Sequence, residues 1–262
     1  DSYRPPEGVA PDARGAWYAD RVQDVIDSFH RDGMGVAGIV LCTIFGSEGI
    51  PMLPPDYLEL AVERVRAAGG LFIADEVQAG FGRSGTAMWQ HQNFGVTPDI
   101  VTLGQPTGTA YPPAGAVARR DLVDAFRQDL MYFNTFGGNA VACAAGQAVL
   151  DVLREEDLVN NARRVGEYAR EQLRGLMARH AIIGDVRGYG LFFGVELVTD
   201  RAAKTPAAAE AKQVVNAMKE AGVLISRIGP HDNVLKLRPP MCFAREHADQ
   251  LVQTLDTVLA AL

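Results

Sequence analysis

Apolar residues in the first half of the chain follow two alternating patterns. From residue 17 to residue 29 they recur at helical spacing, and glycines follow, so a helix is predicted there. Residues 35–44 form a nearly continuous apolar run, which is typical of a strand buried on both faces. A second helical pattern covers residues 56–68, and short apolar runs at 71–74 and 100–103 predict two more strands.

The order strand, helix, strand predicts an α/β domain with a mainly parallel sheet, to which residues 114–118 add a fourth strand. Ligands of such sheets bind at the carboxyl ends of the strands. Asp75 directly follows the run at 71–74, and Gln105 closely follows the run at 100–103. We therefore expect both side chains at one ligand-binding edge.

After Asn139 the pattern changes to longer helices and paired extended segments. Helices are predicted at residues 140–154, 157–180, 207–221 and 244–262, and extended segments at 186–197, 223–226 and 234–237. This order indicates a separate α+β lobe. We place the boundary near Asp157, which gives a partial large domain at residues 1–156 and a small C-terminal domain at residues 157–262.

Composition is that of an ordinary globular protein, with 262 residues, 48% hydrophobic and 22% charged. This length predicts one large domain, or one domain with a smaller lobe. No apolar run reaches the roughly 20 residues that span a bilayer, so we expect no membrane partner. The net charge of -7 argues against nucleic acid as a partner, because nonspecific binding needs a basic face.

The start of the chain is polar and rich in proline, and no apolar segment of a signal peptide follows it. Three widely spaced cysteines, Cys42, Cys143 and Cys242, fit reduced thiols better than a disulfide framework. These features predict a cytoplasmic protein. The first residue is not Met, so we expect a fragment or a processed piece. The five histidines have no metal-ligand spacing, and no metal site is predicted.

Several polar segments follow the predicted strands of the first half. The sequence Asp75-Glu76-Val77-Gln78 leads into a glycine-spaced loop at residues 79–85. Later come polar segments around Gln105 and around residues 133–139. A strand that simply ends in polar residues needs no function, but the succession of such segments favours a site.

Five segments together resemble the class III aminotransferase family. They read FIADEVQAGFGRSG, PDIVTLG, NTFGGN, GDVRGYGLFFGVEL and VLKLRPPMCF. The family consists of pyridoxal-phosphate enzymes of fold type I, so the resemblance implies a PLP-dependent transferase-like fold. KTPAAAEA, GVLIS and GPHDNVLKLRPPMCF are most similar to one subgroup, which holds the alanine–glyoxylate aminotransferase 2-like proteins and the ethanolamine-phosphate phospho-lyases. The resemblance covers essentially the whole chain.

The resemblance implies a role for each matching residue. Asp75 matches the aspartate that pairs with the pyridine nitrogen and keeps the ring protonated. Val77 matches the residue on the ring face, and Gln78 the one that hydrogen-bonds the phenolic oxygen. Thr135 matches a hydroxyl that reaches the cofactor phosphate of the partner subunit, which implies a homodimer.

Three basic residues keep two interpretations each. Lys236 and Arg238 stand where some family members bind the substrate carboxylate or phosphate, but a solvated basic edge strand explains them equally well. Arg187 lies in the family's RGxGL turn, where it either holds the turn or contacts substrate.

Gln105 is the main departure from the family pattern. The family has a lysine there, which bonds covalently to the cofactor aldehyde and moves the proton. An amide nitrogen is neither a nucleophile nor a base, so Gln105 cannot do either. Thr109 and Ala110 also differ from the family's usual Asn-Gly. Scattered change favours natural divergence over a single Lys→Gln substitution, although both remain open.

A second departure concerns the front of the chain. Family members carry an N-terminal stretch with a glycine- and serine-rich turn that cradles the cofactor phosphate at a helix N-terminus. No such loop precedes Gly35, and Cys42 replaces an acidic residue at the end of the first strand. The chain therefore resembles the C-terminal portion of the family, and we expect at most non-covalent binding of pyridoxal 5'-phosphate.

Three functions follow as hypotheses. The first is a class III aminotransferase-type protein, which transfers an amino group from an amine or amino acid to an oxo acid and has Gln105 at the lysine position. The second is a phospho-lyase that acts on a phosphorylated amine. The third is a non-catalytic family member or partner subunit. In each case the site is completed by a second copy or by a missing N-terminal segment.

Overall fold

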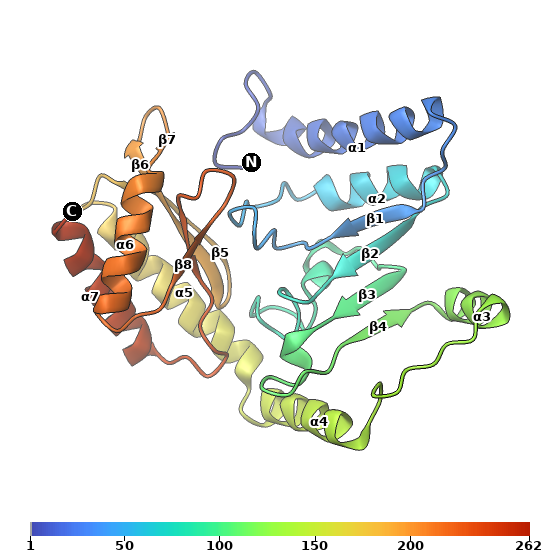
Figure 1. Cartoon of the computed structure of the whole chain (residues 1–262). Coiled ribbons are helices and arrows are strands. Elements are labelled where there is room, and N and C mark those ends of the chain that lie inside the picture. Colours follow the sequence, from blue (N-terminus) through green and yellow to red (C-terminus); the bar gives the residue numbers. More distant parts are fainter. Residues whose placement is uncertain (1) are drawn as a thin grey trace.

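The computed structural model describes residues 2–262, which form two lobes lying side by side (Figure 1). The first lobe contains η1 (Pro11–Ala13), α1 (Arg14–Arg31), β1 (Gly38–Leu41), α2 (Tyr57–Ala67), β2 (Leu71–Asp75), η2 (Gln90–Phe94), β3 (Ile100–Leu103), η3 (Gln105–Thr107), β4 (Gly115–Ala118), α3 (Arg120–Asp129) and α4 (Ala140–Glu155). The second contains α5 (Leu158–Leu176), β5 (Ile183–Tyr189), β6 (Phe192–Asp200), β7 (Thr205–Pro206), α6 (Ala208–Glu220), β8 (Ser226–Ile228), β9 (Val234–Leu237) and α7 (Arg245–Ala260).

The first sheet has the strand order β1-β2-β3-β4. β1, β2 and β3 are parallel to their neighbours, and β4 is antiparallel to β3. Leu58 and Val62 of α2 pack on Phe72 and Ala74 of β2, because the helical spacing of α2 puts its apolar side chains on one face. The predicted α/β architecture with a mainly parallel sheet is confirmed. The carboxyl ends of β2 and β3 lie at the same edge.

The prediction of a first strand buried on both faces over residues 35–44 is wrong. β1 is only four residues long, and exposed positions alternate with half-buried ones. Val40 is 61% exposed. β1 is an edge strand, and α2 covers only the face that carries Ile39 and Leu41. The rule for continuous apolar runs assumes that both faces of a sheet are covered, and within residues 2–262 one face is open.

The second lobe is built on an antiparallel sheet with the strand order β5-β6-β9-β8. Helices α5, α6 and α7 pack together with this sheet around one continuous core. Its fully buried members include Leu173, Leu176, Ile183, Phe193, Leu197, Met218 and Leu235. The predicted extended stretch at 186–197 is found in the β5–β6 hairpin, whereas the strand predicted at 223–226 begins only at Ser226.

The chain passes from one lobe to the other between α4 and α5 (Figure 1). Asp157 lies between the two helices with a φ of 50°, so the backbone turns there. The helix predicted at residues 157–180 corresponds to α5 and ends at Leu176 instead of residue 180. The division into domains at residues 1–156 and 157–262 remains a prediction.

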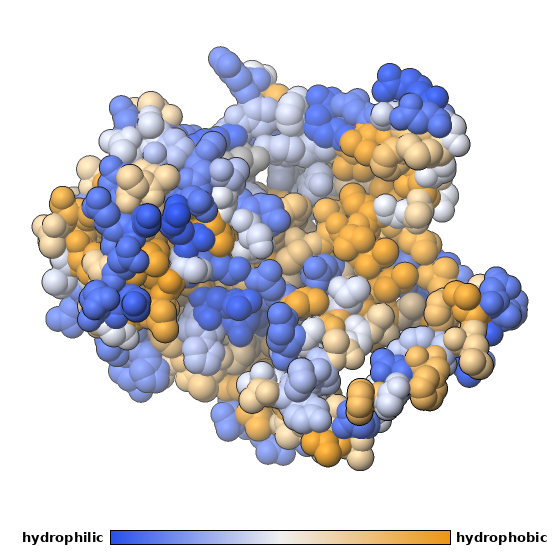
Figure 2. All heavy atoms as spheres, in the orientation of Figure 1, coloured by the Kyte–Doolittle hydropathy of each residue, from blue (hydrophilic) through white to orange (hydrophobic). Residues whose placement is uncertain are grey.

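The first lobe leaves many apolar side chains exposed. Apolar residues gather over the first sheet and the helices above it on the face shown in Figure 2. Others lie between β4 and the first turns of α4: Val117, Val123, Phe126, Leu130, Met131, Tyr132, Phe133, Phe136 and Val141. Helix α3 buries none of its residues. This surface has the composition of a protein core but no covering layer within residues 2–262.

Two absences concern the described residues only. No helix within residues 2–262 combines the length and the hydropathy of a membrane span. In the same part of the chain, no three His, Cys, Asp or Glu side chains are grouped so that they could hold a metal ion.

Candidate functional site

Four of the predicted site residues line one cavity of about 930 Å³. Val77 and Gln78 follow β2, Gln105 begins η3 after β3, and Arg238 follows β9 of the second lobe. Helix α4 contributes a further wall through Ala145 and its neighbours. The fold thus brings together residues that lie more than a hundred positions apart, as expected for a cleft at the carboxyl ends of parallel strands.

Asp75 is the last residue of β2 and is half-buried. The Val77 N–H and the Thr102 hydroxyl donate hydrogen bonds to its Oδ1, at 3.0 and 3.2 Å. Its other oxygen, Oδ2, accepts no hydrogen bond from residues 2–262. Asp75 is not among the described residues that line the cavity, but its two hydrogen bonds fix it directly beside Val77. The carboxylate is therefore oriented and keeps one oxygen for a further donor.

Gln105 is placed beside Val77 by a glycine. A Cβ at Gly104 would lie 2.8 Å from the Val77 side chain, so only glycine lets the end of β3 approach β2 so closely. Gln105 itself is exposed at the start of η3. The structure thus places the amide of Gln105 and the apolar side chain of Val77 on the same cavity wall.

Gln78 connects the two lobes. Its Oε1 accepts hydrogen bonds from Lys236 Nζ at 2.9 Å and from Arg238 Nη1 at 3.1 Å. β9 pairs with both β6 and β8, so the interpretation of Lys236 and Arg238 as a solvated edge strand is wrong about the position of that strand. Lys236 is half-buried, and its ammonium lies 5.2 Å from the centre of the Phe192 ring.

Positive charge is concentrated around Gln78. Burial, together with the nearby Arg238 guanidinium, lowers the pKa of Lys236. The same two causes lower the pKa of Arg83 to about 10. Arg83 also lines the cavity and donates to the backbone oxygens of Leu191 and Pro239, at 3.1 and 2.8 Å. The Arg238 guanidinium thus disfavours the charge of both Lys236 and Arg83, and an anion near these cations would be stabilised.

Sequence reasoning missed two residues that shape this site. One is Arg83, whose signal was its place in the glycine-spaced loop after β2. The other is Glu76, which is fully buried and accepts hydrogen bonds from the N–H groups of Gln90 and His91, at 3.0 and 2.9 Å. Nδ1 of His91 lies 2.7 Å from the same carboxylate. Glu76 thereby connects the backbone between β2 and the cavity residue Val77 to η2.

Thr135 lies outside this cluster. It is exposed on the loop between α3 and α4, and it is not among the described residues that line the cavity. Its assignment to a partner subunit's site remains a prediction.

Arg187 does not line the cavity within the described residues, and only 5% of it is exposed. Its guanidinium donates to the backbone oxygens of Gly49 and Ile50 and pairs with Asp185 and Glu196. Of the two roles considered for it, contact with substrate has no support in this geometry. The backbone it holds belongs to the loop after β1 and not to its own turn.

Comparison with known proteins identifies relatives across nearly the whole chain. The family model described as aminotransferase class-III matches residues 9–259. An alanine–glyoxylate aminotransferase 2 homolog 2, described as mitochondrial, from Arabidopsis thaliana is 47% identical over 92% of this chain and 50% of its own length. An ethanolamine-phosphate phospho-lyase homolog 1 from Caenorhabditis elegans is 39% identical over 95% of this chain and 54% of its own.

Solved structures agree with these similarities. A phospholyase from Arthrobacter in complex with phosphoethanolamine superposes with a TM-score of 0.93 at 45% identity, over 99% of this chain and 63% of that one. An aminotransferase from Bacillus anthracis gives a TM-score of 0.89 at 32% identity, over all of this chain and 60% of that one. The chain spans about half the length of the curated relatives it matches. Because one relative is described as mitochondrial, the cytoplasmic location remains a prediction.

Proposed function

The chain belongs to the class III aminotransferase family, whose members depend on pyridoxal phosphate, and from this premise we propose that its cavity binds this cofactor together with an amine that carries an anionic group. The proposed reaction type is transfer of an amino group from an amine or amino acid to an oxo acid. The observation that carries the proposal is the convergence of Lys236 and Arg238 on Gln78, close to the end of β2 that carries Asp75.

The polar atoms at the end of β2 fit the ring of pyridoxal phosphate. When bound, this cofactor supplies an electron-accepting ring that stabilises negative charge on the substrate carbon. Oδ2 of Asp75 has no donor within residues 2–262, so it can accept a hydrogen bond from a protonated ring nitrogen. The amide nitrogen of Gln78 donates no hydrogen bond within the same residues and can serve a phenolic oxygen. Val77 offers an apolar contact for the ring face.

Gln105 supports a non-covalent mode of binding. It stands at the end of β3 on the same wall as Val77, where a lysine amine would be within reach of the cavity. Its amide has no nucleophilic lone pair and cannot hold or move the proton at the substrate carbon. We therefore propose that this chain retains the binding of cofactor and substrate, and that Gln105 impairs the proton transfer on which amino-group transfer depends.

A second candidate, elimination of phosphate from a phosphorylated amine, has one observation in its favour. Arg83, Lys236 and Arg238 supply more positive charge than a single carboxylate needs. Arginine forks and ammonium groups are the usual ligands of phosphate. The similar Arthrobacter structure is described as a phospholyase in complex with phosphoethanolamine. We propose a phosphorylated amine as the alternative substrate on these grounds.

The third candidate is a partner subunit without activity of its own. The exposed loop that carries Thr135 and the uncovered first sheet support completion of the site by another polypeptide, either a second copy or an N-terminal segment.

Light scattering of the purified chain tests whether the second copy forms a homodimer. A mass near twice 28.2 kDa is expected, and a monomer at all concentrations would contradict it.

The binding proposal is tested by equilibrium dialysis against pyridoxal phosphate, followed by borohydride reduction and peptide mass spectrometry. Saturable binding is expected, with no reduced adduct at residue 105. Absence of saturable binding would refute the proposal, and a reduced adduct at any lysine, Lys236 included, would refute its non-covalent form. Gln105→Lys serves as the positive control. A lysine at this wall is expected to bond covalently to the cofactor aldehyde, and borohydride would reduce that bond to a stable adduct.

A further inference from the structure

The loop after β1 has an unusual backbone. Phe45, Gly49 and Ile50 all have positive φ angles, of 47°, 96° and 55°. This region is unfavourable for a residue with a side chain, and more so for a β-branched residue such as Ile50. Such conformations persist only where the surrounding structure imposes them, and they concentrate at functional sites. The loop Phe45–Ile50 therefore needs contacts that hold it, and some of these come from the other lobe.

Arg187 of β5 supplies those contacts. Its Nε donates to the backbone oxygens of Gly49 and Ile50, each at 3.0 Å, and its Nη2 donates to Gly49 at 2.6 Å. These two residues are the ones with positive φ at the end of the loop. Backbone carbonyls that face a buried guanidinium receive charge-assisted hydrogen bonds, which are stronger than neutral ones. The small lobe thus holds the strained end of a large-lobe loop.

The guanidinium is itself fixed by buried acid. Its Nη1 lies 2.6 Å from Oε2 of Glu196, which is 1% exposed. Oε1 of Glu196 accepts from Asn233 Nδ2 at 3.1 Å and from Arg4. Asp185 adds a further contact to Nη1 at 3.0 Å. A buried cation held by these partners has little freedom to move, so the loop it binds is fixed relative to the second sheet.

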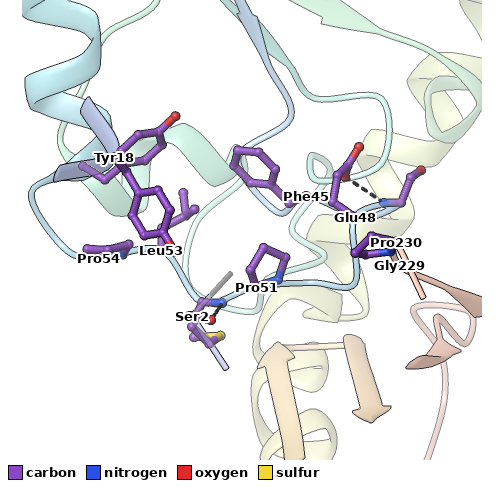
Figure 3. A pocket seen from close by; sticks show the side chains of 12 residues that line it. Ser2, Tyr18, Phe45, Glu48, Pro51, Leu53, Pro54, Gly229 and Pro230 are labelled. Atoms are coloured by element: carbon purple, nitrogen blue, oxygen red, sulfur yellow. Dashed lines mark hydrogen bonds between the residues drawn. The ribbon is translucent and has the colours of Figure 1, made fainter. Parts of the chain in front are cut away.

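The other end of the loop reaches the candidate site. A Cβ at Gly46 would lie 3.4 Å from Oε1 of Gln78 and 2.7 Å from the Phe192 ring. Gly46 thus lies beside the side chain of Gln78, on whose Oε1 Lys236 and Arg238 converge. The loop also borders a second cavity of about 530 Å³, which Phe45 and Glu48 line together with Gly229 and Pro230 (Figure 3).

We propose that Arg187 is a positioning residue of the candidate site: by holding the loop Phe45–Ile50 from the second lobe, it fixes Gln78 where Lys236 and Arg238 meet. The proposal rests on the proposed function in one respect, since it takes the Lys236 and Arg238 pair to be the place where the substrate anion binds. Arg187 acts through the loop and contacts no substrate.

The test compares Arg187→Met with Arg187→Lys. Inorganic phosphate is the probe, its affinity is measured by calorimetry, and amide exchange of Glu48 and Ile50 is followed by mass spectrometry. Both amides donate to the Phe45 oxygen, at 3.2 and 3.1 Å, so they report loop integrity directly. Arg187→Met is expected to weaken phosphate binding at least about tenfold and to accelerate exchange at both amides. Arg187→Lys is expected to recover part of both losses, because an ammonium still donates to the two carbonyls.

Arg170→Met is the matched control. Arg170 is half-buried and also donates to a backbone oxygen, that of Gly190 at 2.9 Å, but it does not touch the loop Phe45–Ile50. It is expected to lower Tm while leaving phosphate affinity and loop exchange within about twofold. If Arg187→Met behaves like Arg170→Met, Arg187 is only a packing residue and the proposal is overturned.

A second variant acts from the opposite end of the loop. Gly46→Ala keeps Arg187 intact but places a methyl group against Gln78 and Phe192. It is expected to weaken phosphate binding while exchange at Ile50 stays slow. Unchanged affinity in this variant would contradict the link between loop and site. If the parent chain binds no phosphate, the anion site of the proposed function fails, and the exchange of Arg187→Met alone then decides whether Arg187 holds the loop.

Discussion

The two lobes differ in how completely they bury their apolar residues. The second lobe surrounds its antiparallel sheet with α5, α6 and α7 and forms one continuous core. The first lobe covers one face of its sheet with α2 and leaves Val40 and Val117 each 61% exposed. A parallel sheet normally has both faces covered. Within residues 2–262 the second lobe therefore has a continuous covered core, whereas the first leaves apolar side chains of its sheet exposed.

Two phenylalanines provide the largest contrast. Phe193 is fully buried in the second lobe, and Phe133 is 79% exposed on the loop before α4. Phe193→Ala is expected to lower the free energy of unfolding by about 3–5 kcal/mol, because it leaves a cavity in a packed core. Phe133→Ala is expected to stay within about 0.5 kcal/mol, since nothing in residues 2–262 covers it. Urea unfolding measures both, and a large loss from Phe133→Ala would mean that this surface is covered in solution.

A buried carboxylate gives the next largest effect and lies in the first lobe. Asp99 is 3% exposed and accepts from the Phe72 N–H at 2.8 Å and from Arg119 Nη1 at 2.6 Å. Asp99→Asn is expected to cost about 1–3 kcal/mol, because it weakens charge-assisted hydrogen bonds that join β2 to Arg119, the residue after β4. Asp256→Asn in α7 is the matched control: this half-buried carboxylate pairs with Arg179 and His180 but is less buried than Asp99, so its loss is expected to cost less. Equal losses in urea unfolding would contradict this ranking.

The same carboxylate sets a pH dependence. Burial raises the pKa of Asp99, but the Phe72 N–H and the Arg66 and Arg119 guanidinium groups outweigh it, so the pKa lies below its usual value. Below about pH 3.9 the Asp99 carboxyl is therefore mostly protonated in the unfolded state, while in the folded state it stays ionised down to a lower pH. The stabilisation by Asp99 is complete above this pH and is lost as the pH falls through the folded pKa. In Asp99→Asn, the free energy of unfolding is expected to change less with pH in this range, which urea unfolding between pH 2 and pH 6 measures.

A smaller effect is expected where the lobes meet. Lys236→Met removes one of the two cations at Gln78 and is expected to weaken binding of inorganic phosphate about tenfold, or ~1.4 kcal/mol. Lys212→Met changes an exposed lysine of α6 and serves as the control. Calorimetric titration measures both affinities. Equal phosphate binding by the two variants would remove Lys236 from the proposed anion site.

Local patterns predicted most of the elements but not their surroundings. The helical spacing before Gly33 and the run before Asp75 gave α1 and β2 at nearly the right residues. The run at residues 35–44 gave β1 too long and too buried, because periodicity cannot tell whether a second layer covers the sheet. α3 was missed although Leu122, Val123 and Phe126 recur at helical spacing, because this pattern covers only ten residues between two segments without regular periodicity.

The candidate site divides in a similar way. Asp75 and Gln105 were predicted from one topological rule, since each follows a parallel strand. The contact between Gln78 and Lys236 joins positions 158 residues apart, and no local pattern encodes it. The same holds for Arg187 and its hold on Gly49. Such contacts depend on how two lobes pack, and the family resemblance, more than the residue pattern, drew attention to Lys236 and Arg238.

We propose that the carboxylate of Asp75 at the end of β2 accepts a hydrogen bond from the ring nitrogen of pyridoxal phosphate. The most direct measurement is equilibrium dialysis of the cofactor with the parent chain, with Asp75→Asn and with Asp256→Asn as the matched control. Asp75→Asn removes the charge that stabilises the protonated ring while keeping the side-chain shape. We expect at least about tenfold weaker binding for Asp75→Asn and parent-like binding for the control. Equal affinity of the parent chain and Asp75→Asn would contradict it.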